Sequence, residues 1–209
     1  LEDWYRYFNQ CSECRRCSVY CPYGIDTAEI TMAAKEVMDS IGMGQKYTNE
    51  IIGKVHKIGN NLGLPGPALL DTLQTLEEEV KDETGQDVRF PVDEAGAEVL
   101  VVAPSADFFA EPHVFSLIGY AKVFHAAGIR WTLSSHASEA GNFGLFIGNY
   151  EQMRAIAMRI REAALELGVK RIVVGECGHA WRVAYSFWNT LAGIGSGADD
   201  PFARMLQSQ

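Results

Sequence analysis

The chain has 209 residues, of which 47% are hydrophobic and 22% are charged. Its formal net charge of -9 argues against binding to the phosphate backbone of nucleic acids, because that binding depends on clustered lysine and arginine side chains. No apolar run approaches the ~18 residues that a membrane-spanning helix needs, so we expect any association with a membrane to come through a partner.

The first ten residues predict a short helix that is rich in aromatic side chains. These are Trp4, Tyr5, Tyr7 and Phe8. We expect them to pack beside the cysteines that follow. The chain starts without Met, reaches its first cysteine within a turn or two of helix, and ends without a recognisable closing element, so we expect it to be a fragment of a longer protein.

Four of the five cysteines follow in the spacing C-x2-C-x2-C-x3-C-P: Cys11, Cys14, Cys17 and Cys21. This is the bacterial ferredoxin spacing, in which short gaps let one tight loop direct thiolates at the corners of a [4Fe–4S] cluster. Zinc is the competing metal, but structural zinc sites usually have two cysteine pairs with a longer spacer. Such clustering does not fit a disulfide framework, and it predicts metal ligation in a reducing compartment.

The sequence leaves two arrangements of these thiolates open. In two-cluster ferredoxins the fourth cysteine of each run ligates the other cluster. The four cysteines therefore either hold one cluster alone, or Cys21 serves a second cluster whose remaining ligands precede Leu1. We favour the second arrangement.

Two arginines and two tyrosines lie in or beside this motif. Arg15 and Arg16 would either offset the charge of a cluster and raise its reduction potential, or form a solvated loop surface. We expect Tyr20 and Tyr23 to shield the cluster from water rather than to donate hydrogen bonds to its sulfurs.

Helical patterns follow the motif at residues 26–42, 46–58 and 67–83. Asp26 or Thr27 can cap the first of these helices, and Gly42 ends it. A charged stretch, EEEVKDETGQD, and a change of pattern then place a domain boundary near residues 85–95. We expect a helical ferredoxin-type segment at residues 1–88 and an α/β domain at residues 95–209.

Strands and helices alternate after residue 97. Three apolar runs rich in β-branched residues predict buried parallel strands, and the segment that follows each run in the sequence predicts a helix. The strands are expected at EVLVVAP, IRWTLSS and KRIVVGE, and the helices at 114–127, at 151–167 and from about Ala180. This order predicts an α/β fold with a short parallel sheet and right-handed crossovers.

The fifth cysteine, Cys177, lies between the third strand and the last helix. This is the carboxyl end of a parallel strand, where open α/β folds place their ligands. His179, Arg182 and the helix N-terminus would favour the thiolate, the form that binds metals and attacks disulfides. We therefore take Cys177 and His179 as candidate catalytic residues; the alternative is a buried structural cysteine.

The loops behind the first two strands, PSADFFAEPH and SSHASEAGNFG, are expected at the same edge of the sheet. Together they predict a pocket above Cys177, with His113, His136 and Glu139 as candidate polar groups. Loop histidines are more often surface hydrogen-bonding residues than ligands, so none of the three is assigned a role by itself. Neither a GxGxxG motif nor a P-loop is present, so nucleotide binding has no support.

Three stretches resemble one family: CSECRRCSVYCPYGIDTAE, GQKYTNEIIGKVHKIGNNLGLPGPAL and GECGHAWRVAYSFWNTLAG. Up to about Gly193 the chain resembles the heterodisulfide-reductase-like iron–sulfur subunits, the heterodisulfide reductase D-like, cysteine-rich domain family. The resemblance implies a two-cluster helical ferredoxin segment followed by a catalytic domain that binds an additional iron–sulfur centre through further cysteines, which this sequence lacks. It matches Cys177 to the edge of that domain and the four clustered cysteines to the second ferredoxin run.

The resemblance also implies partners and a reaction. Electrons would pass between a membrane quinone pool, through a cytochrome b-type membrane subunit, and a small sulfur-carrier protein whose disulfide or trisulfide is the substrate. The chain would lie in the cytoplasm, on the inner membrane, through its partner subunits.

Two alternatives stay open. The first is an electron-transfer subunit of another heterodisulfide-reductase-like complex, one that serves glycerol-3-phosphate or lactate oxidation, which a flavin-bearing partner would indicate. The second is a non-catalytic assembly module in which a cluster or a zinc ion only stabilises the fold, which an electrochemically silent metal site would indicate.

Overall fold

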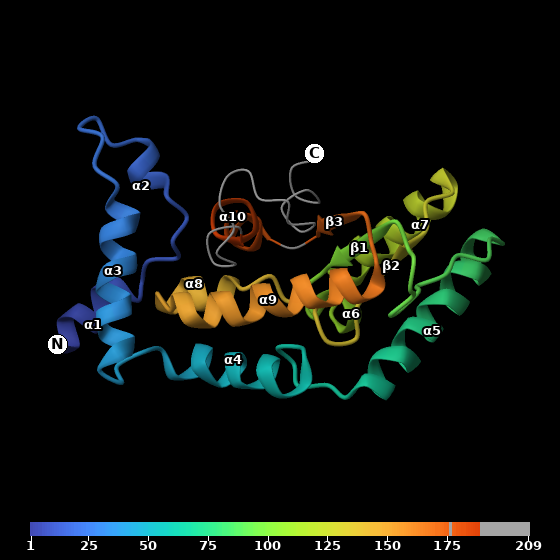
Figure 1. Ribbon diagram of the computed structural model, residues 1–209, viewed down its shortest axis with the longest axis horizontal. Coiled ribbons are helices and arrows are strands. Elements are labelled where there is room, and N and C mark those ends of the chain that lie inside the picture. The colour runs from blue at the N-terminus through green and yellow to red at the C-terminus, as the bar shows by residue number, and fades with distance from the viewer. Residues whose placement is uncertain (176, 189–209) are drawn as a thin grey trace.

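Parallel strands form a short sheet in the second half of the chain (Figure 1). The computed structural model describes residues 1–175 and 177–188, and in these the strands are β1 (Val99–Val102), β2 (Trp131–Thr132) and β3 (Arg171–Val174). The strand order is β2-β1-β3, and Val99 lies opposite both Trp131 and Arg171. The predicted α/β fold with a short parallel sheet is confirmed.

Helices alternate with these strands. They are α6 (Ala106–Phe109), α7 (Val114–Ala127), α8 (Asn142–Ile147), α9 (Tyr150–Leu167) and α10 (Gly178–Ser186). The helices predicted at 114–127 and 151–167 are confirmed, and α10 begins slightly before its predicted start. The sequence assigned α6 and α8 to loops, because helices of four and six residues are too short to show an apolar periodicity.

The helices before the sheet are α1 (Glu2–Phe8), α2 (Arg16–Val19), α3 (Thr27–Ser40), α4 (Lys46–Ile58) and α5 (Gly66–Thr84). The helices predicted after the cysteines therefore form, and Asp26 caps α3 by accepting a hydrogen bond from the N–H of Glu29 at 3.3 Å. α1 buries none of its residues completely, and the rings of Trp4 and Phe8 meet edge to face on it.

Both faces of the sheet are covered. Successive side chains of a strand point to opposite faces. Val99 and Val101 lie in a core with side chains of α5 and α7, whereas Leu100 and Val102 lie in a core with side chains of α9 and α10. Because β1 is buried on both sides, it reads as a continuous apolar run rather than as an alternation of apolar and polar residues.

The cysteine-bearing half of the chain shares the second of these cores. Met32 of α3 is completely buried there. Gly148, at the end of α8, has a φ of +70°, and a Cβ at this position would lie 2.7 Å from the backbone nitrogen of Glu36 in α3. Asn149 then donates a hydrogen bond to Asp39 at 2.6 Å. The backbones of α3 and α8 therefore touch.

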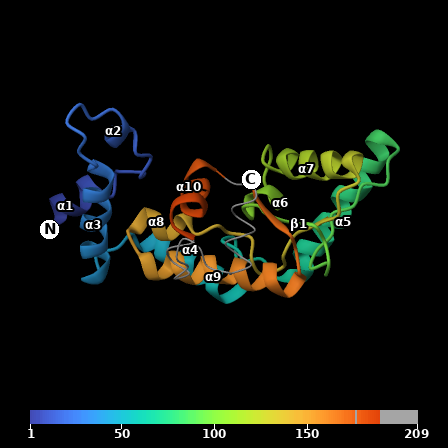
Figure 2. The same cartoon turned by 45° about the horizontal axis from the view of Figure 1, so that its top comes forward.

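α10 lies between α3 and the sheet in both views of the molecule (Figures 1 and 2). It is anchored in the core by Ala180, Val183 and Ala184, all of which are buried. The division of the chain near residues 85–95 stays a prediction, and the last part of the predicted second domain, residues 189–209, lies outside the described residues. Among the described residues, no helix is long and apolar enough to cross a membrane.

Candidate functional site

The four clustered cysteines lie between α1 and α3. Cys11 and Cys14 are in the loop after α1, Cys17 is in α2, and Cys21 follows that helix. All four thiols are free, and each is exposed or half-buried. The segment therefore presents its sulfur atoms near the surface, where a metal centre could be assembled.

The loop turns sharply on both sides of Cys14. Glu13 and Arg15 adopt φ values of 58° and 59°, a left-handed conformation that is uncommon for residues other than glycine. The N–H of Glu13 donates to the Sγ of Cys11 at 3.4 Å. A hydrogen bond from the backbone of Arg16 is the main cause that holds the pKa of the Cys14 thiol below its usual value. Both contacts favour the thiolate, the form of cysteine that binds metals.

Asp26 fastens the cysteine segment to the start of α3. It forms an ion pair with Arg15 and accepts a hydrogen bond from the Oγ of Ser18 at 2.5 Å. The Ser18 hydrogen bond is the largest of the contributions that lower the pKa of Asp26. Arg15 is thus paired within the protein, whereas Arg16 is exposed.

The tip of the segment carries exposed apolar side chains. Val19, Tyr20 and Tyr23 are 75%, 78% and 86% exposed. Most of each side chain is therefore in contact with solvent, and shielding of a cluster by the two tyrosines stays a prediction.

Behind the loop, Glu13 is completely buried between two cations. The Nζ of Lys35, in α3, lies 3.5 Å from its Oε1, and the Nη1 of Arg182, in α10, lies 3.7 Å from its Oε2. Both cations also hold the backbone: Lys35 donates to the carbonyl of Cys11 at 2.6 Å, and Arg182 donates to the carbonyl of Glu13 at 2.5 Å. The peptide between the first two cysteines is therefore held by α3 and by α10.

Burial and charge act in opposite directions on this group. Burial raises the pKa of Glu13, and the charges of Lys35 and Arg182 oppose that rise. Burial likewise lowers the pKa of Lys35 against the opposing charge of Glu13. Neither Glu13 nor Lys35 was predicted from the sequence. The available signal was Lys35 itself, because it occupies the buried face of α3 among apolar side chains.

The donor chemistry of the segment fits an iron–sulfur cluster. Four free thiols lie within one short segment, backbone N–H groups point at two of them, and Lys35 and Arg182 donate to the backbone carbonyls of Cys11 and Glu13 beside them. Among the described residues, however, no group of three or more cysteine, histidine, aspartate or glutamate side chains is arranged to hold a single metal ion.

Cys177 lies at the N-cap of α10, directly behind β3, as predicted, and it is exposed. The ring of His179 lies edge-on against Phe146 at 5.1 Å between ring centres, and its Nε2 is buried without a hydrogen-bond partner in the described residues. Arg182 was expected to act on Cys177, but it reaches Glu13 instead, because it lies more than a turn farther along the helix.

The loops behind β1 and β2 meet, but buried side chains fill the space between them. The Oε1 of Glu139 accepts hydrogen bonds from the Oγ of Ser105 at 2.6 Å and from the N–H groups of Ser105 and Asn61, each at 3.2 Å. Glu139 and Ser105 are 2% and 0% exposed. Where a pocket was predicted, the two loops are therefore joined by a buried network, and His136 is exposed outside it.

A second buried carboxylate, Asp107, lies in the same region and was not anticipated from the sequence. Its Oδ1 lies 3.9 Å from the Nδ1 of His113, whose side chain is 60% exposed, and its Oδ2 has no hydrogen-bond partner in the described residues. Burial, with a smaller contribution from the charge of Glu139, raises the pKa of Asp107 to about 6, although His113 opposes the rise. Of the three predicted polar groups, only Glu139 is enclosed.

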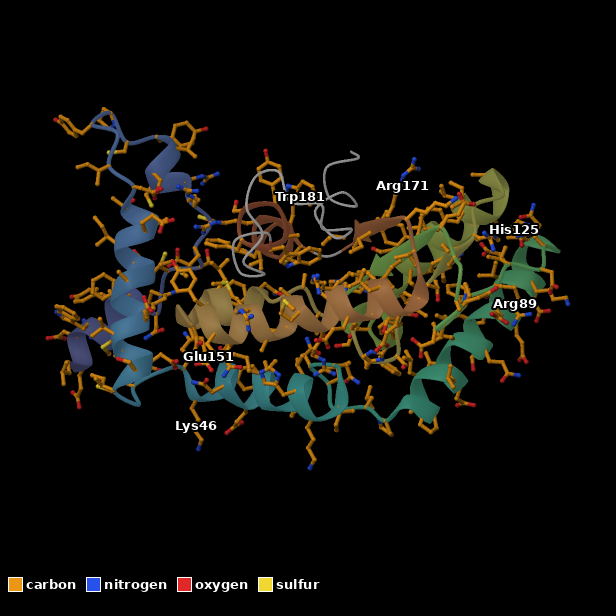
Figure 3. All side chains as sticks on the ribbon, in the orientation of Figure 1. Lys46, Arg89, His125, Glu151, Arg171 and Trp181 are labelled. Carbon is orange, nitrogen blue, oxygen red and sulfur yellow. The ribbon has the colours of Figure 1, made fainter. Side chains whose placement is uncertain are left out.

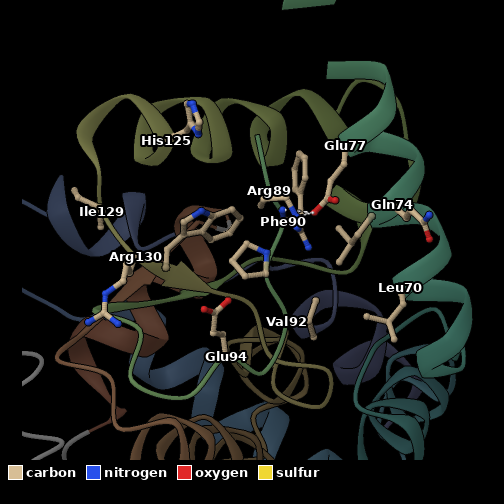
Figure 4. A pocket seen from close by; sticks show the side chains of 13 residues that line it. Leu70, Gln74, Glu77, Arg89, Phe90, Val92, Glu94, His125, Ile129 and Arg130 are labelled. Carbon is tan, nitrogen blue, oxygen red and sulfur yellow. Dashed lines mark hydrogen bonds and ion pairs between the residues drawn. The ribbon is translucent and has the colours of Figure 1, made fainter. Parts of the chain in front are cut away.

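An open cavity of about 840 Å³ lies at the other edge of the sheet, between α5, α7 and the start of β2 (Figure 4). Phe90 and Trp131 are among its apolar lining residues, and the ion pair of Glu77 with Arg89 also lines it. Because β2 begins here, the cavity is at the amino ends of the strands, away from the edge that carries Cys177.

Comparisons with known proteins place the chain near one group. No family model matches the sequence, and no solved structure matches it significantly. Over 195 residues the chain is 42% identical to the Hdr-like menaquinol oxidoreductase iron-sulfur subunit of Archaeoglobus profundus and, equally, to the Hdr-like menaquinol oxidoreductase iron-sulfur subunit 2 of Archaeoglobus fulgidus. These matches cover 91% of this chain and 35% of each relative.

The chain thus spans about a third of the length of the curated relatives that it matches. The similarity supports the heterodisulfide-reductase-like (Hdr-like) family that the sequence motifs predicted.

Proposed function

We propose that this chain is the electron-transfer part of an Hdr-like menaquinol:thiol–disulfide oxidoreductase subunit, similar to DsrK of the membrane complex linked to dissimilatory sulfite reductase (DsrMKJOP). One observation carries the proposal: through Arg182, the helix α10, whose N-cap is Cys177, holds the peptide between Cys11 and Cys14. A candidate electron-carrier site and a candidate reactive thiol are thereby joined by one short helix. The 42% identity to iron–sulfur subunits supports this reading.

In this proposal Cys11, Cys14 and Cys17 ligate one [4Fe–4S] cluster, and Cys21 either completes that cluster or serves a second one; a bound cluster supplies one-electron transfer. The residues around them have separate tasks. The N–H of Glu13 and that of Arg16 stabilise thiolate sulfur, and the two buried cations fix the course of the loop.

The sulfur chemistry belongs to Cys177 in this proposal. Its thiol is exposed at the carboxyl end of β3, where a sulfur-carrier protein can approach it. Reduction of one disulfide to two thiols consumes two electrons and two protons, and oxidation of one menaquinol to menaquinone releases the same numbers. His179 is proposed to hold a proton at its Nε2, which has no partner in the described residues.

The partners follow from the same proposal. A cytochrome b-type membrane subunit would exchange electrons with the quinone, and the small sulfur-carrier protein would bring a disulfide or trisulfide. The chain itself would be peripheral, on the cytoplasmic face of the membrane. The names of the two relatives contain the words menaquinol oxidoreductase, which supports menaquinol as the electron donor. The same names describe iron-sulfur subunits, which supports an iron–sulfur cluster in this chain.

Anaerobic analysis of iron, sulfide and zinc, combined with EPR spectra of the dithionite-reduced protein, tests the proposal. We expect about four iron and four sulfide for each cluster, with a signal that appears on reduction. Stoichiometric zinc without a reducible signal would contradict electron transfer and would favour an assembly module.

A further inference from the structure

We infer that Arg182 is a positioning residue through which α10 sets the reduction potential of the cysteine segment. The inference rests on the proposed function, because it concerns the potential of a cluster held by that segment. Arg182 lies more than 160 positions from the cysteine motif, so a residue from the other half of the chain would help to determine that potential.

Arg182 is placed to act in this way by several contacts. Its Nη1 donates to the carbonyl of Glu13 and lies 3.7 Å from the Oε2 of the same residue, while its Nη2 lies 3.9 Å from the Oε1 of Glu29. The guanidinium also lies over the ring of Phe187, 5.8 Å from its centre. With a side chain only 12% exposed, Arg182 has little freedom to turn away from the loop.

The two cations that hold Glu13 differ in origin. Lys35 lies in α3, in the same segment as the cysteines, whereas Arg182 comes from a helix whose apolar face is buried in the core beside the sheet. Figure 2 shows α10 between that segment and the sheet. Any displacement of α10 is therefore transmitted to the peptide between the first two cysteines through Arg182.

The sign of the expected effect follows from charge. Reduction adds an electron to a cluster, so a nearby cation in a region of low dielectric constant favours the reduced state. Two cations, Lys35 and Arg182, meet the carboxylate of Glu13, and a second carboxylate, that of Glu29, lies 3.9 Å from Arg182. Removing the charge of Arg182 makes this group of charges more negative, so the midpoint potential should fall.

The test is an EPR-monitored redox titration of the full-length protein in its complex, with Arg182→Gln, Arg182→Lys and a matched control. The control is Arg171→Gln, which makes the same charge change at an exposed arginine at the start of β3 (Figure 3). We expect Arg182→Gln to disfavour reduction on the order of tenfold, which corresponds to about 59 mV for one electron. Arg182→Lys should restore part of the loss, since it keeps the charge but not the planar fork.

Two outcomes would overturn the inference in different ways. A wild-type protein that contains no iron and sulfide would overturn both the inference and the proposed function. A normal cluster whose potential and EPR line shape are the same in Arg182→Gln and in Arg171→Gln would overturn the inference alone.

A second variant decides the matter if Arg182→Gln fails to fold. Glu13→Gln removes the carboxylate and leaves the two cations, so it should raise the potential. A potential that is unchanged or lowered in Glu13→Gln would contradict electrostatic control by this group, because a purely structural disturbance has no reason to follow the sign of the charge.

Discussion

At the scale of single residues, three buried carboxylates show how the protein accommodates negative charge. Glu13 lies between two cations, and Glu139 accepts three hydrogen bonds. Asp107 has neither arrangement, since its nearest cationic group is a largely exposed histidine at 3.9 Å. A carboxylate that is buried without compensation takes up a proton more readily, which is why the pKa of Asp107 rises to about 6.

Asp107→Asn should therefore change how the stability of the protein depends on pH. The pKa of Asp107 is higher in the folded state than the ordinary value of 3.8. The protonated carboxyl therefore contributes its full stabilisation below pH 3.8, and this contribution is lost as pH rises through about 6. As pH rises from 4.5 to 7.5, the free energy of unfolding of the variant should increase relative to that of the wild type, on the order of 2–3 kcal/mol.

Guanidinium unfolding at several pH values measures this difference in free energy. Asp87→Asn is a suitable control, because it removes an exposed carboxylate that pairs with Lys81. A difference between Asp107→Asn and the wild type that stays constant from pH 4.5 to pH 7.5 would show that Asp107 does not titrate in this range.

The two groups of cysteines should separate in spectroscopy. Cys17→Ser removes a proposed ligand and should abolish the intact cluster, whereas Cys177→Ser should leave the cluster spectrum unchanged and impair disulfide reduction in the full-length protein. Absorption and EPR spectra, measured with the rate of turnover, distinguish the two. Equal loss of the cluster in both variants would contradict this division of roles.

At the scale of elements, the contact between α8 and α3 depends on a residue without a side chain. Gly148 ends α8 in the left-handed conformation, and a Cβ there would come within 2.7 to 2.8 Å of backbone and side-chain atoms of α3. Only glycine combines this φ with so close an approach of two backbones. The position of the cysteine-bearing helix therefore depends on Gly148.

Gly148→Ala should destabilise the protein by more than the same change at Gly96. Both glycines have a positive φ, but a Cβ at Gly96 meets nothing within 4 Å. The left-handed conformation costs roughly 1–2 kcal/mol in either variant, and the clash with α3 adds to this only at Gly148. Thermal and denaturant unfolding of both variants measure the loss of stability. Equal losses in the two variants would mean that α3 can shift to accommodate the Cβ at position 148 without a cost in free energy.

At the scale of the whole molecule, the cysteine-bearing helices and the α/β part share one core. Met32 of α3 is completely buried in the same cluster as Leu100 of β1 and Ile160 of α9. The ion pair of Arg182 with Glu13 and the contact at Gly148 cross the same boundary. The two parts, although predicted as separate domains, are thus expected to support each other.

Met32→Ala should weaken both parts together. Truncating a buried methionine costs about 2–5 kcal/mol, whereas Ile30→Ala on the exposed side of α3 should cost much less. Hydrogen exchange resolved for α3 and α9 provides the measurement. Loss of protection in α3 alone, with α9 unaffected, would instead support two independently folding domains.

Local patterns in the sequence determined most of the elements and the chemistry of the donors. Long helices repeat their apolar side chains every three to four residues, and buried strands are continuous apolar runs, so both are visible without a structure. The spacing of the four cysteines likewise predicts an iron–sulfur cluster, because the reach of a short loop is fixed by the number of its residues.

Only the tertiary structure decided which distant residues meet. Glu13 and Arg182 are 169 positions apart, and Ser105 and Glu139 are 34 apart, so no local pattern marks either contact. The same holds for Gly148 against α3, where the close approach depends on how two helices are docked. Long-range pairing of charges and backbones is set by packing of the whole core, and it therefore became visible only in the folded molecule.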